Sequence, residues 1–327
     1  MLKGTTYAAL ALGLLAALVM VLWQGFGVVA HTVALVGWWF PSLVAWYVLP
    51  ALAMGASWSL VFPPGIGLTW RTLTWINYLG ASVNALLPVG AVGGEVVKAL
   101  MVVRSGVAGA MAGAAVVTDK AAQAASQLAF GLMGVGALIY LEAHPDLVTG
   151  LLAATLFFCV LLAAFFWLQR EGMFGRLARG LERMTRGRLW WNVVGSAAQL
   201  DDALDRIYRH RLRITGACAW RLVARLLFVV ETWAVAQWMG HPIGWVEALM
   251  IESLTQTVRG MAFVVPSGLG AQEGAFLLLA GVAGLPPEVA LSISLVKRGR
   301  EIAAGAPALI ALQWGAGKGL LASRRGG

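Results

Sequence analysis

The chain has 327 residues, of which 60% are hydrophobic and only 12% are charged, and its formal net charge is +9. Its mean hydropathy is +0.79. This composition excludes an ordinary soluble domain, because such a domain needs far more polar surface. The two cysteines, Cys159 and Cys218, both fall in apolar stretches, so they indicate neither a disulfide framework nor a metal site.

Apolar stretches long enough to cross a hydrocarbon core of ~30 Å recur along the chain. In chain order they are Thr6–Trp23, Ser42–Phe62, Gln123–Leu141, Leu147–Leu168 and Ile214–Met239, and then Val246–Val265 and Val289–Gln313, which also carry charges. Within lipid each backbone polar group must be paired inside its own segment, so these stretches are predicted to be helices. The first lacks a convincing cleavage site and is expected to be retained. We predict an all-α polytopic membrane protein with a single transmembrane domain, residues 1–327.

The positive charge is concentrated in one polar loop, residues 170–213, which holds ten of the 24 Lys and Arg residues. Under the positive-inside rule this loop and both termini are cytoplasmic, which predicts a multi-pass protein of the bacterial inner membrane. Anionic lipid is a simpler partner for the loop than nucleic acid. Within the loop, Leu189–Tyr208 is either an amphipathic helix on the membrane surface or part of a solvated basic linker.

The pattern Pro-x-Gly-x-x-x-x-Glu, followed at a fixed distance by a cation, occurs twice in the chain. The same difference in residue number, called the offset below, separates every residue of the first copy from its counterpart in the second. The corresponding pairs are Pro88 and Pro266, Gly90 and Gly268, Glu95 and Glu273, and Lys120 and Arg298. Proline removes a backbone donor and glycine permits unusual dihedral angles, so a helix break is expected at each motif. The half-helix that follows each break would point its positive N-terminus into the membrane, where it attracts anions.

Counting crossings from a cytoplasmic N-terminus gives the two motifs opposite orientations. The first repeat, residues 72–141, enters from the cytoplasm and returns to the same side near Arg104, and a long helix then crosses outward. The second repeat, residues 246–313, enters from the outside. The sequence therefore predicts about six full transmembrane helices and two broken re-entrant segments in an inverted-topology repeat, as in many transporters.

Several ionisable residues fall near the middle of the predicted spans, where one charge costs about 2.5–3.5 kcal/mol on insertion scales. The candidate substrate-binding residues are the cations Lys98, Lys120, Lys297 and Arg298 and the acids Glu95, Asp119, Glu273 and Glu301. The candidate supporting residues are Asn84, Arg221, Arg225, Glu231, Glu252, Arg259 and Gln272. Structural alternatives stay open: Arg221 and Arg225 snorkel to the interface, Glu252 and Arg259 only pair with each other, and Glu95 and Glu273 only cap half-helices.

These motifs resemble those of a known family. Asn84-Ala-Leu-Leu-Pro-Val-Gly-Ala-Val-Gly-Gly-Glu95 resembles the first signature of the lysylphosphatidylglycerol synthase transmembrane domain, also called the flippase-like domain. Val265-Pro-Ser-Gly-Leu-Gly-Ala-Gln-Glu273 and the Lys297–Glu301 cluster resemble its second signature, in wording most similar to the hopanoid-biosynthesis-associated HpnL branch. The resemblance covers nearly the whole chain and implies lipid translocation. The aminoacyl-transferase domain of larger members does not follow the last predicted span, so lysyl transfer is not expected.

The leading hypothesis is a lipid transporter, or flippase, for an anionic phospholipid or a hopanoid, with a cavity between the two repeats and no cofactor or metal. The alternative is an integral-membrane transferase that uses Glu95, Asp119 or Glu273 as a base, although no Ser-His-Asp set or metal cluster supports it. A scaffold that recruits partners through residues 170–213 leaves the membrane charges unexplained. A homo-oligomer and an association with lipid-biosynthesis enzymes are both compatible with the sequence.

Overall fold

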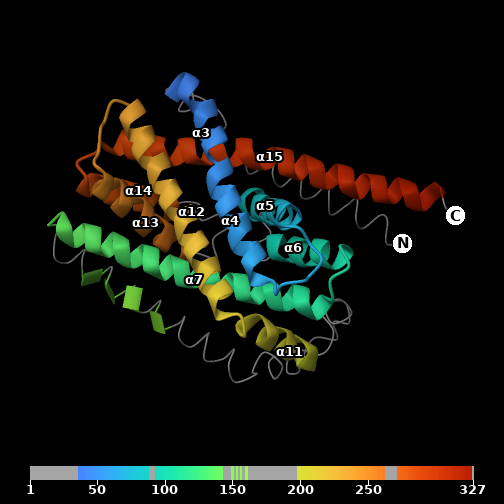
Figure 1. Ribbon diagram of the computed structural model, residues 1–327. Coiled ribbons are helices and arrows are strands. Elements are labelled where there is room, and N and C mark those ends of the chain that lie inside the picture. The colour runs from blue at the N-terminus through green and yellow to red at the C-terminus, as the bar shows by residue number, and fades with distance from the viewer. Residues whose placement is uncertain are drawn as a thin grey trace, which may run out of the picture.

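The computed structural model describes residues 36–87, 93–142, 197–261 and 271–325, together with several positions between 149 and 160. Within these residues the protein consists of helices without strands (Figure 1), so the predicted all-α class is confirmed. Some predictions fall outside the described residues: those for Thr6–Trp23, for most of Leu147–Leu168, for the start of the amphipathic segment and for the helix breaks at Pro88, Gly90, Pro266 and Gly268.

The elements have the following bounds: η1 (Gly37–Trp39), α3 (Phe40–Trp46), α4 (Val48–Val61), α5 (Trp70–Leu86), α6 (Gly93–Arg104), α7 (Gly109–Tyr140), α11 (Ala197–Tyr208), α12 (Arg211–Trp238), α13 (Trp245–Met261), α14 (Ala271–Val282) and α15 (Pro287–Arg325). Two described segments are long and apolar enough to cross a membrane, Gly37–Val61 and Gly109–Tyr140. The last helix is longer than predicted, because its start at Pro287 suits a first helical position and the internal Pro307 does not end it.

The constant offset between the two motifs also relates the helix boundaries. Helices α6 and α14 begin and end at positions that correspond under this offset, and so do the first residues of α7 and α15. Each short helix is closed by a glycine with a positive φ, 93° at Gly106 and 73° at Gly284. The following residues donate to the carbonyl five positions back, Val107 at 3.4 Å and Leu285 at 2.9 Å. Such a closure needs a left-handed residue, and glycine adopts that conformation without strain.

The helices of the two predicted repeats are packed crosswise. Helix α5 contacts α15, and α13 contacts α7, so the first helix of each repeat lies against the long helix of the other. Helices α4 and α12, which precede the repeats, lie against each other and run between α7 and α15 (Figure 1). The apolar core is correspondingly divided into one cluster around Trp58 and Phe62 and another around Phe130 and Phe276.

Helix α11 occupies the end of the amphipathic segment in the basic loop. Its apolar residues Leu200, Leu204 and Ile207 are buried in the Trp58 cluster, and the helix packs against α7. The amphipathic pattern is therefore satisfied by contact with the protein. This part of the loop is therefore a packed helix and not a solvated linker, and its position at the membrane surface stays a prediction.

Close helix contact makes one glycine a sharp test of the packing. A Cβ atom built on Gly94 of α6 would lie 2.0 Å from the carbonyl oxygen of Gly80 on α5. Gly94→Ala should therefore force the two helices apart and lower stability by about 1–3 kcal/mol, as overpacking does. The matched control is Gly136→Ala on α7, where nothing lies within 4 Å. Thermal unfolding in detergent should show a lower midpoint for Gly94→Ala only, and equal midpoints would contradict this packing.

Candidate functional site

A first charged cluster joins α6, α7 and α12 behind the first motif. Glu95 lies in the first turn of α6, and Lys98 one turn later binds it at 2.7 Å. Lys98 also contacts Asp119 of α7 at 2.6 Å, and Arg221 of α12 binds the other oxygen of Asp119 at 2.6 Å. Lys120, next to Asp119, reaches back to Glu95 at 2.7 Å. In the described part of the chain, two carboxylates thus hold three cations from three helices.

Most side chains of the first cluster are buried, but one of its cations is partly exposed. Asp119 is fully buried, and Lys98 and Arg221 are nearly so. The Lys120 side chain, by contrast, is 36% exposed. Asn84 of α5 accepts the backbone N–H of Gly94 at 2.7 Å, which satisfies one donor at the start of α6 and holds that helix end beside the cluster. Lys120 is therefore the cation of this cluster that an arriving ligand can reach.

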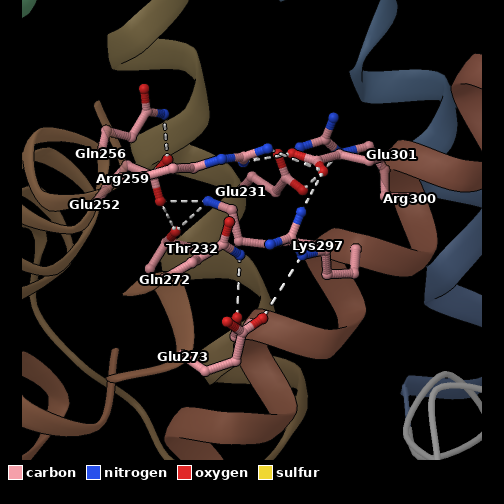
Figure 2. A network of polar contacts seen from close by, with 12 residues as sticks. Glu231, Thr232, Glu252, Gln256, Arg259, Gln272, Glu273, Lys297, Arg300 and Glu301 are labelled. Carbon is pink, nitrogen blue, oxygen red and sulfur yellow. Dashed lines mark hydrogen bonds and ion pairs between the residues drawn. The ribbon is translucent and has the colours of Figure 1, made fainter. Parts of the chain in front are cut away.

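A second charged cluster joins α12, α13, α14 and α15 behind the second motif (Figure 2). Its described members are Glu231, Glu252, Arg259, Glu273, Lys297, Arg298, Arg300 and Glu301. Arg298 lies 3.6 Å from Glu273 and 3.5 Å from Glu301, whereas Arg259 binds Glu301 more closely, at 2.8 Å. Among these described residues four cations face four carboxylates, so the cluster is balanced in charge.

Two buried ion pairs support the second cluster from α12 and α13. Lys297 pairs with Glu252 and also donates to the Thr232 hydroxyl at 2.8 Å, and Thr232 donates to Glu252 at 2.5 Å. Arg300 binds Glu231 at 2.9 Å. Its guanidinium lies 4.7 Å from the ring centre of Tyr47 on the turn before α4. Such cation–π contact compensates part of the lost hydration.

The same ion pair occurs in both clusters at the offset of the repeat. Glu95 binds Lys120 in the first, and Glu273 lies beside Arg298 in the second. In each case the acid is in the first turn of the short helix that follows the motif, and the cation is on the following long helix. Each motif acid therefore lies beside the cation that follows it in the sequence at the repeated spacing.

The neighbouring positions differ between the clusters. Asp119 corresponds at this offset to Lys297, and Lys98 corresponds to Phe276. The charge is therefore reversed at one position and lost at the other. The described residues of the first cluster nevertheless include more cations than acids, because Arg221 joins them from α12, whereas those of the second include equal numbers.

A chain of hydrogen bonds connects the two clusters through α12 and α13. The Gln123 side chain donates to Asp119 at 2.9 Å, and Arg225 donates to the backbone carbonyl of Gln123 at 3.2 Å. Arg225 also donates to Gln256 at 2.9 Å, and Gln256 donates to Glu252 at 2.7 Å. The two charged clusters consequently belong to one polar network.

Comparison with known families identifies the chain. It matches the model of the lysylphosphatidylglycerol synthase TM region over residues 9–306. The chain belongs to this family. The match confirms the family resemblance seen in the motifs and assigns the chain to a membrane, lipid-related group, whereas the finer HpnL placement stays a prediction. No curated protein and no solved structure matches the chain.

Several expectations for this family member are resolved by the side-chain contacts. Arg221 and Arg225 do not snorkel to an interface, because each is held by α7 within the protein. Glu252 and Arg259 share a helix face but do not pair with each other, since they bind Lys297 and Glu301 on α15. Gln272 donates to Ser294 at 3.0 Å and so ties α14 to α15. Within the residues that the structure describes, no group of His, Cys, Asp and Glu could hold a metal ion.

Sequence reasoning missed three residues of the network: Gln123, Thr232 and Gln256. The signal for Gln123 was available, because it corresponds to Glu301 at the repeat offset and lies one helical turn after Asp119. Gln256 similarly follows Glu252 by one turn on the same helix face. Thr232 had no sequence signal, since its contacts to Lys297 and Glu252 depend on how three helices pack.

The Lys297–Glu252 pair gives a direct test of charge pairing in this family member. Glu252→Gln should leave Lys297 buried without a carboxylate and lower stability by about 3–5 kcal/mol. The double variant Glu252→Gln with Lys297→Met should recover most of that loss, because no unpaired charge remains. Glu288→Gln, at the exposed start of α15, is the matched control. Thermal unfolding in detergent measures all three, and a double variant less stable than Glu252→Gln would contradict the pairing.

Proposed function

We propose that the chain moves a lipid with an anionic or otherwise polar head group between the leaflets of the bacterial inner membrane. The observation that carries this proposal is the paired arrangement of Glu95 with Lys120 and of Glu273 with Arg298. Each pair lies behind a motif that is expected to interrupt its helix within the membrane. The cargo is an anionic phospholipid or a hopanoid-type lipid, in keeping with the motif wording.

Each of the two repeat-related cations shares an acid with a second cation. Glu95 keeps a second cation, Lys98, at 2.7 Å when Lys120 leaves it. Glu301 likewise keeps Arg259 at 2.8 Å when Arg298 leaves it. A head-group phosphate can therefore take the place of Glu95 at Lys120, or of Glu301 at Arg298, while each of these two acids still has a cation. An uncompensated buried charge would cost several kcal/mol, and this exchange avoids that cost.

The inverted repeat supplies the two states that transport requires. Two equivalent units that enter the membrane from opposite faces can expose one shared region alternately to each side. The matching bounds of α6 and α14, and the crosswise packing of α5 on α15 and of α13 on α7, support such a symmetry. The transferase alternative is less well supported, because it requires a carboxylate free to act as a base, whereas Glu95 and Asp119 are each bound by two cations.

Lys120 is the sharpest test of the transport proposal. Lys120→Gln removes the accessible cation and one charge-assisted hydrogen bond to the head group, worth about 1.5–3 kcal/mol, so leaflet exchange should slow about 10- to 100-fold. Lys120→Arg should retain most of the rate, because it restores the charge. Arg104→Gln removes a charge from the exposed end of α6 and is the control. The measurement is exchange of fluorescent head-group lipid in vesicles that contain the purified protein; exchange by Lys120→Gln at the wild-type rate would contradict the proposal.

The opposite orientation of the motifs is tested by cysteine accessibility. With Cys159 and Cys218 replaced by serine, single cysteines are placed at residues 88–92 and at residues 266–270. A reagent that cannot cross the membrane should label the two sets preferentially from opposite faces, because each motif opens toward the side from which its segment enters. Inside-out and right-side-out vesicles provide the comparison. Labelling of both sets from the same face would refute the inverted repeat.

A further inference from the structure

An apolar groove with a volume of about 540 Å³ lies between α3 and α4 on one side and α5 and α15 on the other. Its size falls in the range of ordinary small-molecule sites, about 300–1,000 Å³. Aromatic rings contribute much of its wall: Tyr47, Trp70, Trp75 and Tyr78. Small residues on the facing helices, Ala51 on α4 and Ala303 and Ala304 on α15, leave the space between them.

Arg71 is the charged residue among the described residues that line this groove. Arg71 and Trp70 open the first turn of α5, both are exposed, and the guanidinium lies 6.0 Å from the Trp70 ring centre. The same described lining contains no carboxylate. Tryptophan and arginine are typical residues of the membrane–water interface, where they meet lipid head groups. The groove thus combines an apolar interior with a cation at its edge, which complements an apolar chain that ends in an anion.

The groove is structurally connected to the second charged cluster. Tyr47 lines the groove and also stacks on Arg300, with the Arg300 guanidinium carbon 4.7 Å from its ring centre. On α15, Ala303 and Ala304 follow Arg300 by one helical turn. The hydroxyl of Tyr78 on α5 donates to the carbonyl of Ala304 and ties the two walls together. An occupant of the groove would therefore lie one side chain away from the buried ion pairs.

From this geometry we propose that the groove binds the apolar tail of an anionic membrane phospholipid whose phosphate lies at Arg71. Charge complementarity selects the occupant, because the described lining of the groove offers a cation and no acid. The inference rests on the proposed function only in taking this bound lipid to be the transported one. The tail stays against Tyr47 and Trp75 while the head group moves to the charged clusters, so the groove is the site at which cargo enters.

Two kinds of variant test the groove. Ala51→Trp should fill it from α4, and Ala303→Leu should partly fill it from α15, so purified protein should retain at least tenfold less bound phosphatidylglycerol. Arg71→Gln should reduce the preference for phosphatidylglycerol over phosphatidylcholine about tenfold, and Arg71→Lys should keep most of it. The control is Leu278→Trp on α14, at an exposed position outside the groove. Native mass spectrometry of full-length protein released from nanodiscs with equal amounts of both lipids measures retention, and gel filtration confirms folding.

The outcomes separate this inference from the proposed function. If Ala51→Trp and Ala303→Leu retain phosphatidylglycerol as the wild type does, or if Arg71→Gln keeps its preference, the groove is not the binding site. If the fillers lose the bound lipid and the wild type exchanges no lipid between leaflets, the groove stands and transport fails. If the wild type exchanges lipid and both fillers exchange it at the same rate, transport stands and the groove is not its entry site.

Discussion

The structure depends on one constraint, which is that a charge inside a membrane protein must be accompanied by its counter-charge. Lipid provides no hydrophobic force that drives helices together, so polar contacts and close packing must hold them. Asp119 of α7 meets this need by binding Lys98 of α6 and Arg221 of α12 at 2.6 Å each. A single carboxylate thereby fixes the relative position of three helices. The second cluster connects α12, α13, α14 and α15 in the same manner through its acids.

Ion pairing explains where the buried charged side chains lie, but it does not explain why the chain has charged residues rather than apolar ones at these positions. Replacing a buried ion pair by well-packed apolar residues is often neutral or stabilising, so the pairs are weak evidence for a purely structural role. The contacts also differ in a systematic way: Glu95 and Glu301 each bind one cation that belongs to the repeat and one that does not. An acid with two cations can release one of them to an anion at small cost. Under the proposed function, such an acid would allow a head-group phosphate to bind one of the cations without leaving the acid unpaired.

The sequence alone predicted those features of the fold that depend on residues near one another in the chain or on the repeated motif. Apolar period and length predicted α12 to within a few residues, and the constant offset between the motifs predicted α6 and α14 as equivalent elements. The partners of the buried charges could not be derived in this way. Arg221 and Asp119 are 102 residues apart, and their contact depends on the packing of α12 on α7. The shared helix face of Glu252 and Arg259 suggested a pair that does not form, because both side chains face α15 instead.

The departures from symmetry are as informative as the symmetry itself. A transporter with two identical halves would bind an anion equally at both, and no step of its cycle would favour movement from one to the other. Here Asp119 corresponds to Lys297 and Lys98 to Phe276. Arg221 of α12 adds a third cation to the first cluster, so its described residues carry a surplus of cations, whereas those of the second are neutral in sum. At an effective dielectric constant of about 20, one unit charge at about 4 Å changes an interaction by about 4 kcal/mol. Under the proposed function, the first cluster should therefore hold an anionic head group more tightly than the neutral second cluster does.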